Sequence, residues 1–173
     1  MPRARKLHGC YNDLMKVIFY YSSMSEEKVI QETLKDWQFI IENNYEYWMP
    51  NGVNPDSSIN NIRTAIKNEL ILENINKVKA SFEESLKENI FHLKNFADQV
   101  GLSLPHQIFV TLTQYGTGGS YELPNQVFIN IRSNYGSPFS AFVHELVHLL
   151  IEKPVVERYR LSHQQLNKWF PGK

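Results

Sequence analysis

Residues 137–150 read SPFSAFVHELVHLL, and this stretch decides the fold of the chain around it. Ser137 is a typical N-cap residue, and Pro138 suits the first position of a helix, where the backbone N–H has no helical partner. We expect Pro154 to end this helix after about four turns. Placed at about 100° per residue, the large apolar side chains share one broad face, through which the helix is predicted to pack. That face consists of Phe139, Phe142, Val143, Leu146, Val147, Leu149 and Leu150.

The opposite arc of the helix carries His144, Glu145 and His148, an H-E-x-x-H sequence. Histidines four residues apart stand one turn above each other, close enough for a nitrogen of each ring to bind one tetrahedral zinc ion. Glu145 lies beside that pair, where its carboxylate can accept a proton from a metal-bound water. The alternative is a surface helix that carries two histidines and a glutamate without a metal. The glutamate, the helix caps and the strands that precede the helix favour the zinc site.

At these residues the chain resembles the zincins, the H-E-x-x-H metallopeptidase superfamily that includes the thermolysin-like and metzincin enzymes. The resemblance implies that His144 and His148 bind Zn²⁺ and that Glu145 is the catalytic base. In this superfamily the motif helix packs beneath a small sheet whose edge strand binds the extended substrate backbone, which makes Gln126–Arg132 the candidate edge strand. Pro154 stands where the metzincins have a histidine, so the resemblance is to the thermolysin-like (gluzincin) enzymes.

The sequence does not identify a third zinc ligand, although catalytic zinc normally has three protein ligands. Thermolysin-like enzymes take a glutamate from a later helix, but residues 167–173 contain no Asp, Glu or His. Glu157 could fold back after the proline or form a surface salt bridge, and His163 could bind the metal or be structural. Glu152 lies a further turn beyond the motif, and we expect it either to be solvated or to contact a metal ligand without binding the metal itself. The remaining alternative is that this chain holds no third ligand.

Two segments before the motif helix are predicted strands, because β-branched and apolar residues alternate in Gln107–Gln114 and Gln126–Arg132. The glycine-rich residues 115–120 between them lack the lysine of a phosphate-binding P-loop, and we expect a flexible lip or a hairpin connection there.

The first hundred residues have helical periodicity over most of their length. A short strand is predicted at 16–22, and helices at 23–45 and, with a break, at 59–101. We therefore expect a single α+β domain, 1–173, of zincin-like fold. Its mainly helical part is 1–100, and 101–173 supplies the strand pair and the motif helix.

Composition excludes several classes of protein. The chain has 173 residues, with 18 basic and 18 acidic side chains, so its net charge of zero argues against broad binding to nucleic acids or anionic membranes. Its single cysteine, Cys10, cannot form a disulfide within the chain. The longest strongly apolar run, 17–21, is far shorter than the roughly 20 residues of a membrane-spanning helix. We expect a cytoplasmic protein without a nucleic-acid or membrane partner, with secretion as the alternative.

The sequence thus predicts a zinc-dependent hydrolase, a peptidase acting on a peptide or protein substrate. The alternative is a catalytically impaired or C-terminally curtailed zincin-like domain with a binding or regulatory role. Candidates for a hydrogen bond to a tetrahedral intermediate are Tyr121, Tyr135 and Tyr159. The histidines outside the motif and its C-terminal flank are interpreted as ordinary residues: His8, His92 and His106.

Overall fold

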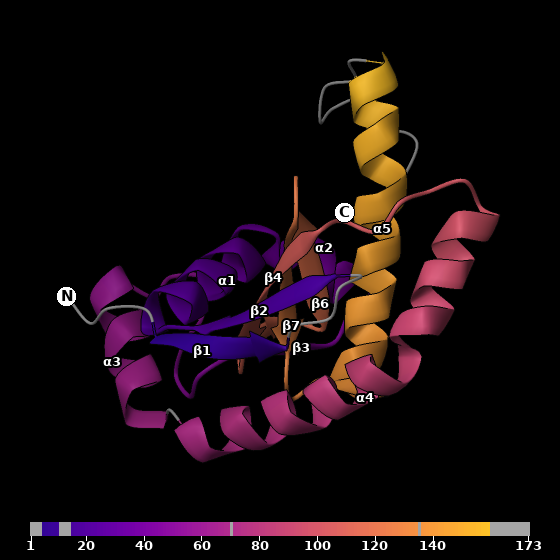
Figure 1. The fold of residues 1–173 in the computed structure, drawn as a ribbon. Coiled ribbons are helices and arrows are strands. Elements are labelled where there is room, and N and C mark those ends of the chain that lie inside the picture. Colours follow the sequence, from indigo (N-terminus) through magenta and orange to yellow (C-terminus); the bar gives the residue numbers. More distant parts are fainter. Residues whose placement is uncertain (1–4, 11–14, 70, 135, 160–173) are drawn as a thin grey trace.

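The computed structural model describes residues 5–10, 15–69, 71–134 and 136–159, with the backbone alone at 5–10, 72 and 152–159. Helices and strands together give a mixed α/β architecture (Figure 1). The strands are β1 (Arg5–Cys10), β2 (Lys16–Tyr21), β3 (Tyr47–Trp48), β4 (Gln107–Thr113), β5 (Gly116–Thr117), β6 (Gly119–Glu122) and β7 (Gln126–Asn130). The helices are α1 (Ser23–Lys35), α2 (Trp37–Glu42), α3 (Ile59–Glu69), α4 (Leu72–Gln99) and α5 (Pro138–Tyr159).

The main sheet has five strands in the order β1-β2-β4-β7-β6. Its central strands β2, β4 and β7 run parallel, whereas β1 and β6 run antiparallel to their neighbours at the two edges. The central strands are rich in β-branched and aromatic residues, as expected of strands that are covered on both faces. A separate two-stranded sheet pairs β3 with β5.

All three strands predicted from the sequence are confirmed, as β2, β4 and β7, but the role expected of the last strand is wrong. β7 lies between β4 and β6 and is therefore not an edge strand. The edge position belongs to β6, which begins inside the glycine-rich segment and forms an antiparallel pair with β7. The segment is therefore not a hairpin between β4 and β7, because these two strands are parallel. The chain returns through β6, which comes between them in the sequence and lies outside β7 in the sheet.

The helices follow the predicted periodicity except at their ends. The helix predicted at 23–45 is divided at Asp36 into α1 and α2, and the expected break in the second helix separates α3 from α4. Gly101, with a φ of 72°, follows the end of α4. The predicted end of the motif helix at Pro154 is wrong, since α5 continues to Tyr159. A proline inside a helix removes one backbone hydrogen bond, and here the turns before and after it nevertheless continue.

The sheet is covered on both faces. Val127 and Ile129 point towards α4 and α5, where they share a core with Phe82 of α4 and Phe142 of α5. Phe128 points the other way because successive residues of a strand alternate, and Nζ of a lysine on α1 lies 4.8 Å from its ring centroid. In Figure 1, α4 passes beneath the sheet and continues beside α5. The core therefore combines β2 and α4 from the predicted helical part with β4, β7 and α5 from the rest.

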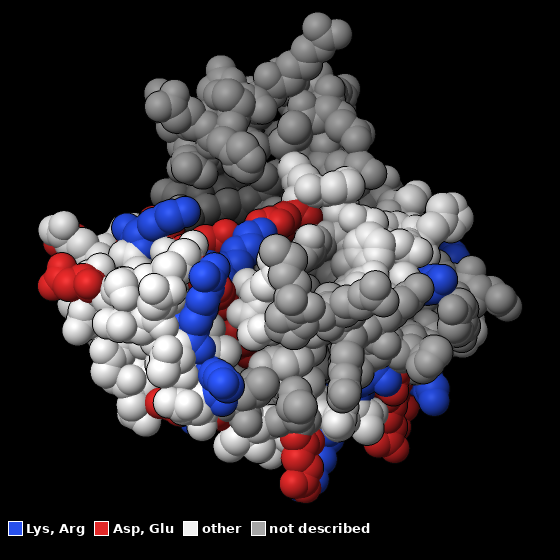
Figure 2. Space-filling model, turned by 90° about the vertical axis from the view of Figure 1, so that its left-hand side faces the viewer, with Lys and Arg blue, Asp and Glu red and all other residues white. Residues whose placement is uncertain are grey.

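Charged residues of both signs lie side by side on the surface shown in Figure 2. Ion pairs connect neighbouring elements: Arg63 of α3 binds Glu27 of α1 at 2.7 Å, and Lys28 of α1 pairs with Glu122 of β6. Within the described part of the chain, no helix has the length and apolar character needed to cross a bilayer.

Candidate metal centre

Helix α5 positions the H-E-x-x-H residues through its cap and its apolar face. The hydroxyl oxygen of Ser137 accepts a hydrogen bond from the backbone N–H of Ser140 at 3.1 Å, which confirms the predicted N-cap. Phe142, Leu146 and Leu149 are buried against the sheet and α4. The helix is thereby fixed in rotation, and the arc opposite this face carries the two histidines.

The imidazoles of His144 and His148 converge. Their Nε2 atoms lie 3.1 Å apart, and the ring planes are inclined by 66°. Two nitrogens bound to one tetrahedral zinc ion, each at about 2.0–2.1 Å, are about 3.3 Å apart. The 3.1 Å separation is that of a hydrogen bond between the two rings, and it is also close to the separation that a shared metal ion requires. His144 is exposed and His148 is half-buried, so the pair is open to solvent on one side.

Glu145 lies beside this pair but is nearly enclosed, with 9% of its surface exposed. Burial raises the pKa of its carboxyl to about 7. A carboxyl group with a pKa near the working pH is suited to accept a proton and release it again. Burial, and then the neighbouring His144, lower the pKa of His148, which favours the neutral imidazole that binds metals.

The edge strand β6 forms the second side of the site. Gly119 and Tyr121 pair with Ile129 and Val127, whose side chains belong to the core beneath α5, so both residues face this helix. A Cβ atom on Gly119 would lie only 2.9 Å from Oε1 of Glu145. Glycine at this position therefore lets the strand approach the carboxylate closely.

The outer edge of β6 carries backbone groups of the same two residues. The backbone N–H of Asn130 donates to the carbonyl oxygen of Gly118 at 3.1 Å, which makes this pair a hydrogen-bonded one. Hydrogen-bonded and non-bonded pairs alternate in an antiparallel ladder. Ser120 therefore also bonds towards β7, whereas the N–H and C=O groups of Gly119 and Tyr121 point away from β7, at the edge of the sheet.

No third metal ligand accompanies the two histidines among the described side chains, which contain no group of three His, Cys, Asp or Glu residues able to hold a metal ion. For Glu152 the structure describes the backbone but not the side chain. His163 lies outside the described residues. The backbone at Glu157 is described, and α5 is unbroken there. Nine residues separate it from His148, which corresponds to about 13 Å along the axis and half a turn around it. The proline break after which Glu157 could have folded back is therefore absent from the described backbone.

The tyrosine candidates are separated by the structure. Tyr121 lies at the site, with its ring against His148. The backbone at Tyr159 lies at the far end of α5, three turns beyond the motif. Tyr135 lies outside the described residues. His92 of α4 and His106, just before β4, are exposed.

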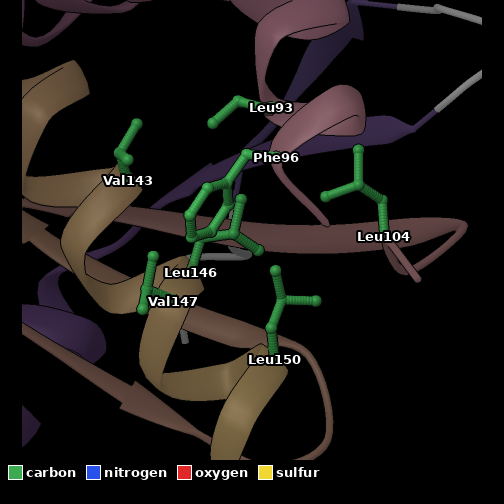
Figure 3. Close-up of a pocket in the computed structure, with 7 residues that line it drawn as sticks. All are labelled: Leu93, Phe96, Leu104, Val143, Leu146, Val147 and Leu150. Atoms are coloured by element: carbon green, nitrogen blue, oxygen red, sulfur yellow. The ribbon is translucent and has the colours of Figure 1, made fainter. Parts of the chain in front are cut away.

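Figure 3 shows an apolar pocket between α4 and α5. Neither His144 nor His148 is among its lining residues. Val143 and Val147 of α5 and Phe96 of α4 point into it, and all of its lining residues are apolar. Such a pocket offers packing surface without any group that could take part in chemistry.

Sequence reasoning missed Gly119 as a residue of the site, and it named Tyr121 as a candidate without foreseeing its contact with the ring of His148. The segment GSYE has no run of β-branched residues to indicate a strand. The available signal was the glycine-rich composition itself, since a glycine in a strand often marks a close approach of another group.

Comparison of this chain with protein-family models, with curated proteins and with solved structures found no match in any of the three. The functional argument therefore depends on the geometry of the residues themselves.

Proposed function

We propose that this protein is a zinc-dependent hydrolase, a peptidase of zincin-like α+β fold, with His144 and His148 as metal ligands and Glu145 as general base. The observation that carries the proposal is the 3.1 Å separation of the two Nε2 atoms, one turn apart on α5. A bound zinc ion would polarise the substrate carbonyl and activate a water molecule. The donor set fits this metal, because neutral imidazole nitrogens on a helix are common zinc ligands.

In the proposed reaction the two histidines and Glu145 have different roles. The two imidazoles hold the metal at the open side of α5. The carboxylate of Glu145 accepts the proton of the attacking water and returns it to the leaving amine, for which its pKa near 7 is suited. Its burial against Gly119 holds the carboxylate in one place and keeps bulk water from one side of it.

The edge strand β6 supports a peptide as the proposed substrate. The N–H and C=O groups of Gly119 point to the sheet edge, beside the histidine helix. An extended peptide can pair with such an edge as an additional strand, which uses backbone groups that every peptide has. Lying antiparallel to β6, the peptide would pass next to the H-E-x-x-H residues. A peptide or protein substrate is therefore favoured over a small molecule.

Metal content tests the proposal directly. Protein purified from zinc-supplemented medium should contain about one zinc ion per chain by elemental analysis, and His144→Ala and His148→Ala should lose it. The exposed His92 offers a matched control, because His92→Ala removes an imidazole that lies outside the site. Wild-type protein that remains free of zinc under these conditions would contradict the proposal.

A second candidate function is a zincin-like domain that binds peptides or regulates a partner without catalysis. The observation that favours it is the pair of ligands, two rather than three, among the described side chains. Glu145→Gln separates the two candidates. It should abolish peptide hydrolysis while zinc is retained if the protein is an enzyme, and should change neither zinc content nor peptide binding if the domain is not catalytic.

A further inference from the structure

The ring of Tyr121 lies parallel to the imidazole of His148. The ring centroids are 5.4 Å apart, and the planes differ by only 7°. Separations of 4.5–7 Å with an offset are typical of favourable aromatic stacking. The contact joins two elements, since the tyrosine comes from the edge strand and the histidine from α5.

The position of the tyrosine ring is set by the sheet rather than by the helix. Tyr121 is paired with Val127, and its ring packs against the main core. On the opposite face of the same strand, Glu122 is held by Lys28 of α1. The strand is thus fixed from β7 and from α1, independently of any metal.

The histidine, by contrast, needs a support to hold its plane. The terminal torsion of a histidine side chain is broad, so an unsupported ring can turn its nitrogens away from a shared point. His148 is half-buried, and the stacked tyrosine covers one of its faces. In this orientation its Nε2 faces Nε2 of His144.

We propose that Tyr121 is a positioning residue for the metal ligand His148: its ring fixes the imidazole plane so that the two Nε2 atoms converge before metal binds. This inference rests on the proposed zinc site and adds a role for the edge strand in building it. Without the ring, the imidazole must be ordered when the metal binds, and this cost lowers the affinity.

Zinc affinity measured by competition with a chromophoric chelator tests the role of the ring. Tyr121→Leu is expected to weaken zinc binding by about tenfold, the lower end of the loss seen when a group that orients a metal ligand is removed. Tyr121→Phe keeps the ring and should bind zinc like the wild type. The visible spectrum of the Co²⁺-substituted protein should change in the leucine variant and not in the phenylalanine variant.

A matched control uses Tyr20, a half-buried tyrosine of β2 whose ring packs on Phe109 in the same sheet. Tyr20→Leu makes the same change away from α5, so it should lower thermal stability without altering zinc affinity. If the Tyr121→Leu protein does not fold, Tyr121→Val takes its place, because valine also removes the ring and is well suited to a strand.

The outcomes distinguish a failure of the positioning role of Tyr121 from a failure of the zinc site itself. Wild-type affinity in a folded Tyr121→Leu or Tyr121→Val protein would overturn the positioning role and leave the zinc site intact. Equal weakening in Tyr121→Phe would also overturn it, because the hydroxyl rather than the stacked ring would then be responsible. A wild-type protein that binds no zinc would overturn the proposed function and this inference together.

Discussion

Replacing Gly119 with alanine is predicted to displace the carboxylate of the proposed general base. The added Cβ would lie 2.9 Å from Oε1, 3.1 Å from Cγ and 3.3 Å from Cδ of Glu145. Ordinary contacts of a Cβ atom begin at 3.4 Å, so the carboxylate must move by about half an ångström. A displacement of about 1 Å in an active site can cost about 100-fold in rate, and half of it corresponds to about tenfold.

We therefore expect Gly119→Ala to lower kcat by about tenfold with little change in zinc content. The φ of Gly119 lies outside the left-handed region, so alanine introduces no backbone strain. Activity would be followed with a mixture of internally quenched peptides, and zinc by elemental analysis. The control is Ser120→Ala, at the next residue of β6, whose side chain points to the opposite face of the sheet.

Undiminished kcat in a folded, zinc-loaded Gly119→Ala protein would refute this reasoning. It would mean that the carboxylate tolerates the displacement, and that the close approach of β6 is a matter of packing alone.

Three further predictions concern stability. Burial raises the pKa of Glu26, whose Oε1 accepts the backbone N–H of Gln114, from 4.5 to about 8. The folded protein therefore binds this proton more tightly than the unfolded chain, and the free energy of unfolding should fall by up to about 1.4 kcal/mol per pH unit between pH 5 and about 8. In urea unfolding at a series of pH values, Glu26→Gln should flatten this dependence; an unchanged slope would assign it to other groups. Phe82→Ala removes a buried ring in edge contact with three other aromatic rings and should cost about 3–5 kcal/mol by denaturant unfolding, whereas a loss below 1 kcal/mol would contradict the packing described. Ser137→Ala removes the N-cap of α5 and should cost about 1 kcal/mol by thermal unfolding, unless the hydrogen bond to Ser140 contributes nothing.

The parts of the fold that could be predicted have a local signal. The strands β2, β4 and β7 were recognisable because their β-branched and apolar residues suit a covered sheet. The helix that carries His144, Glu145 and His148 was recognisable from its cap and its periodicity. Burial of Phe142 and Leu146 on the face predicted to pack follows from the same periodicity.

The parts that could not be predicted depend on contacts between distant segments. β4 and β7 can pair in parallel because β6, which lies between them in the sequence, reverses the chain direction. The four residues of β6 carry no strand signal of their own. The run of α5 through Pro154 could not be foreseen either, since a proline after a long helix usually marks its end. The position of Gly119 against Glu145 depends on the strand order and on the direction of β6, and neither could be predicted from the sequence.

The parallel pairing of β2 with β4 has a consequence for how the chain folds. Lys16 lies opposite Gln107, so about ninety residues must be closed into a loop before these strands can join. During synthesis β2 has to wait until α4, which can form from local contacts, and then β4 have left the ribosome. Every residue placed at the candidate metal centre, in contrast, belongs to one continuous stretch, 119–148. We expect the hairpin of β6 and β7 and the start of α5 to approach each other early, and the rest of the sheet to close around them later.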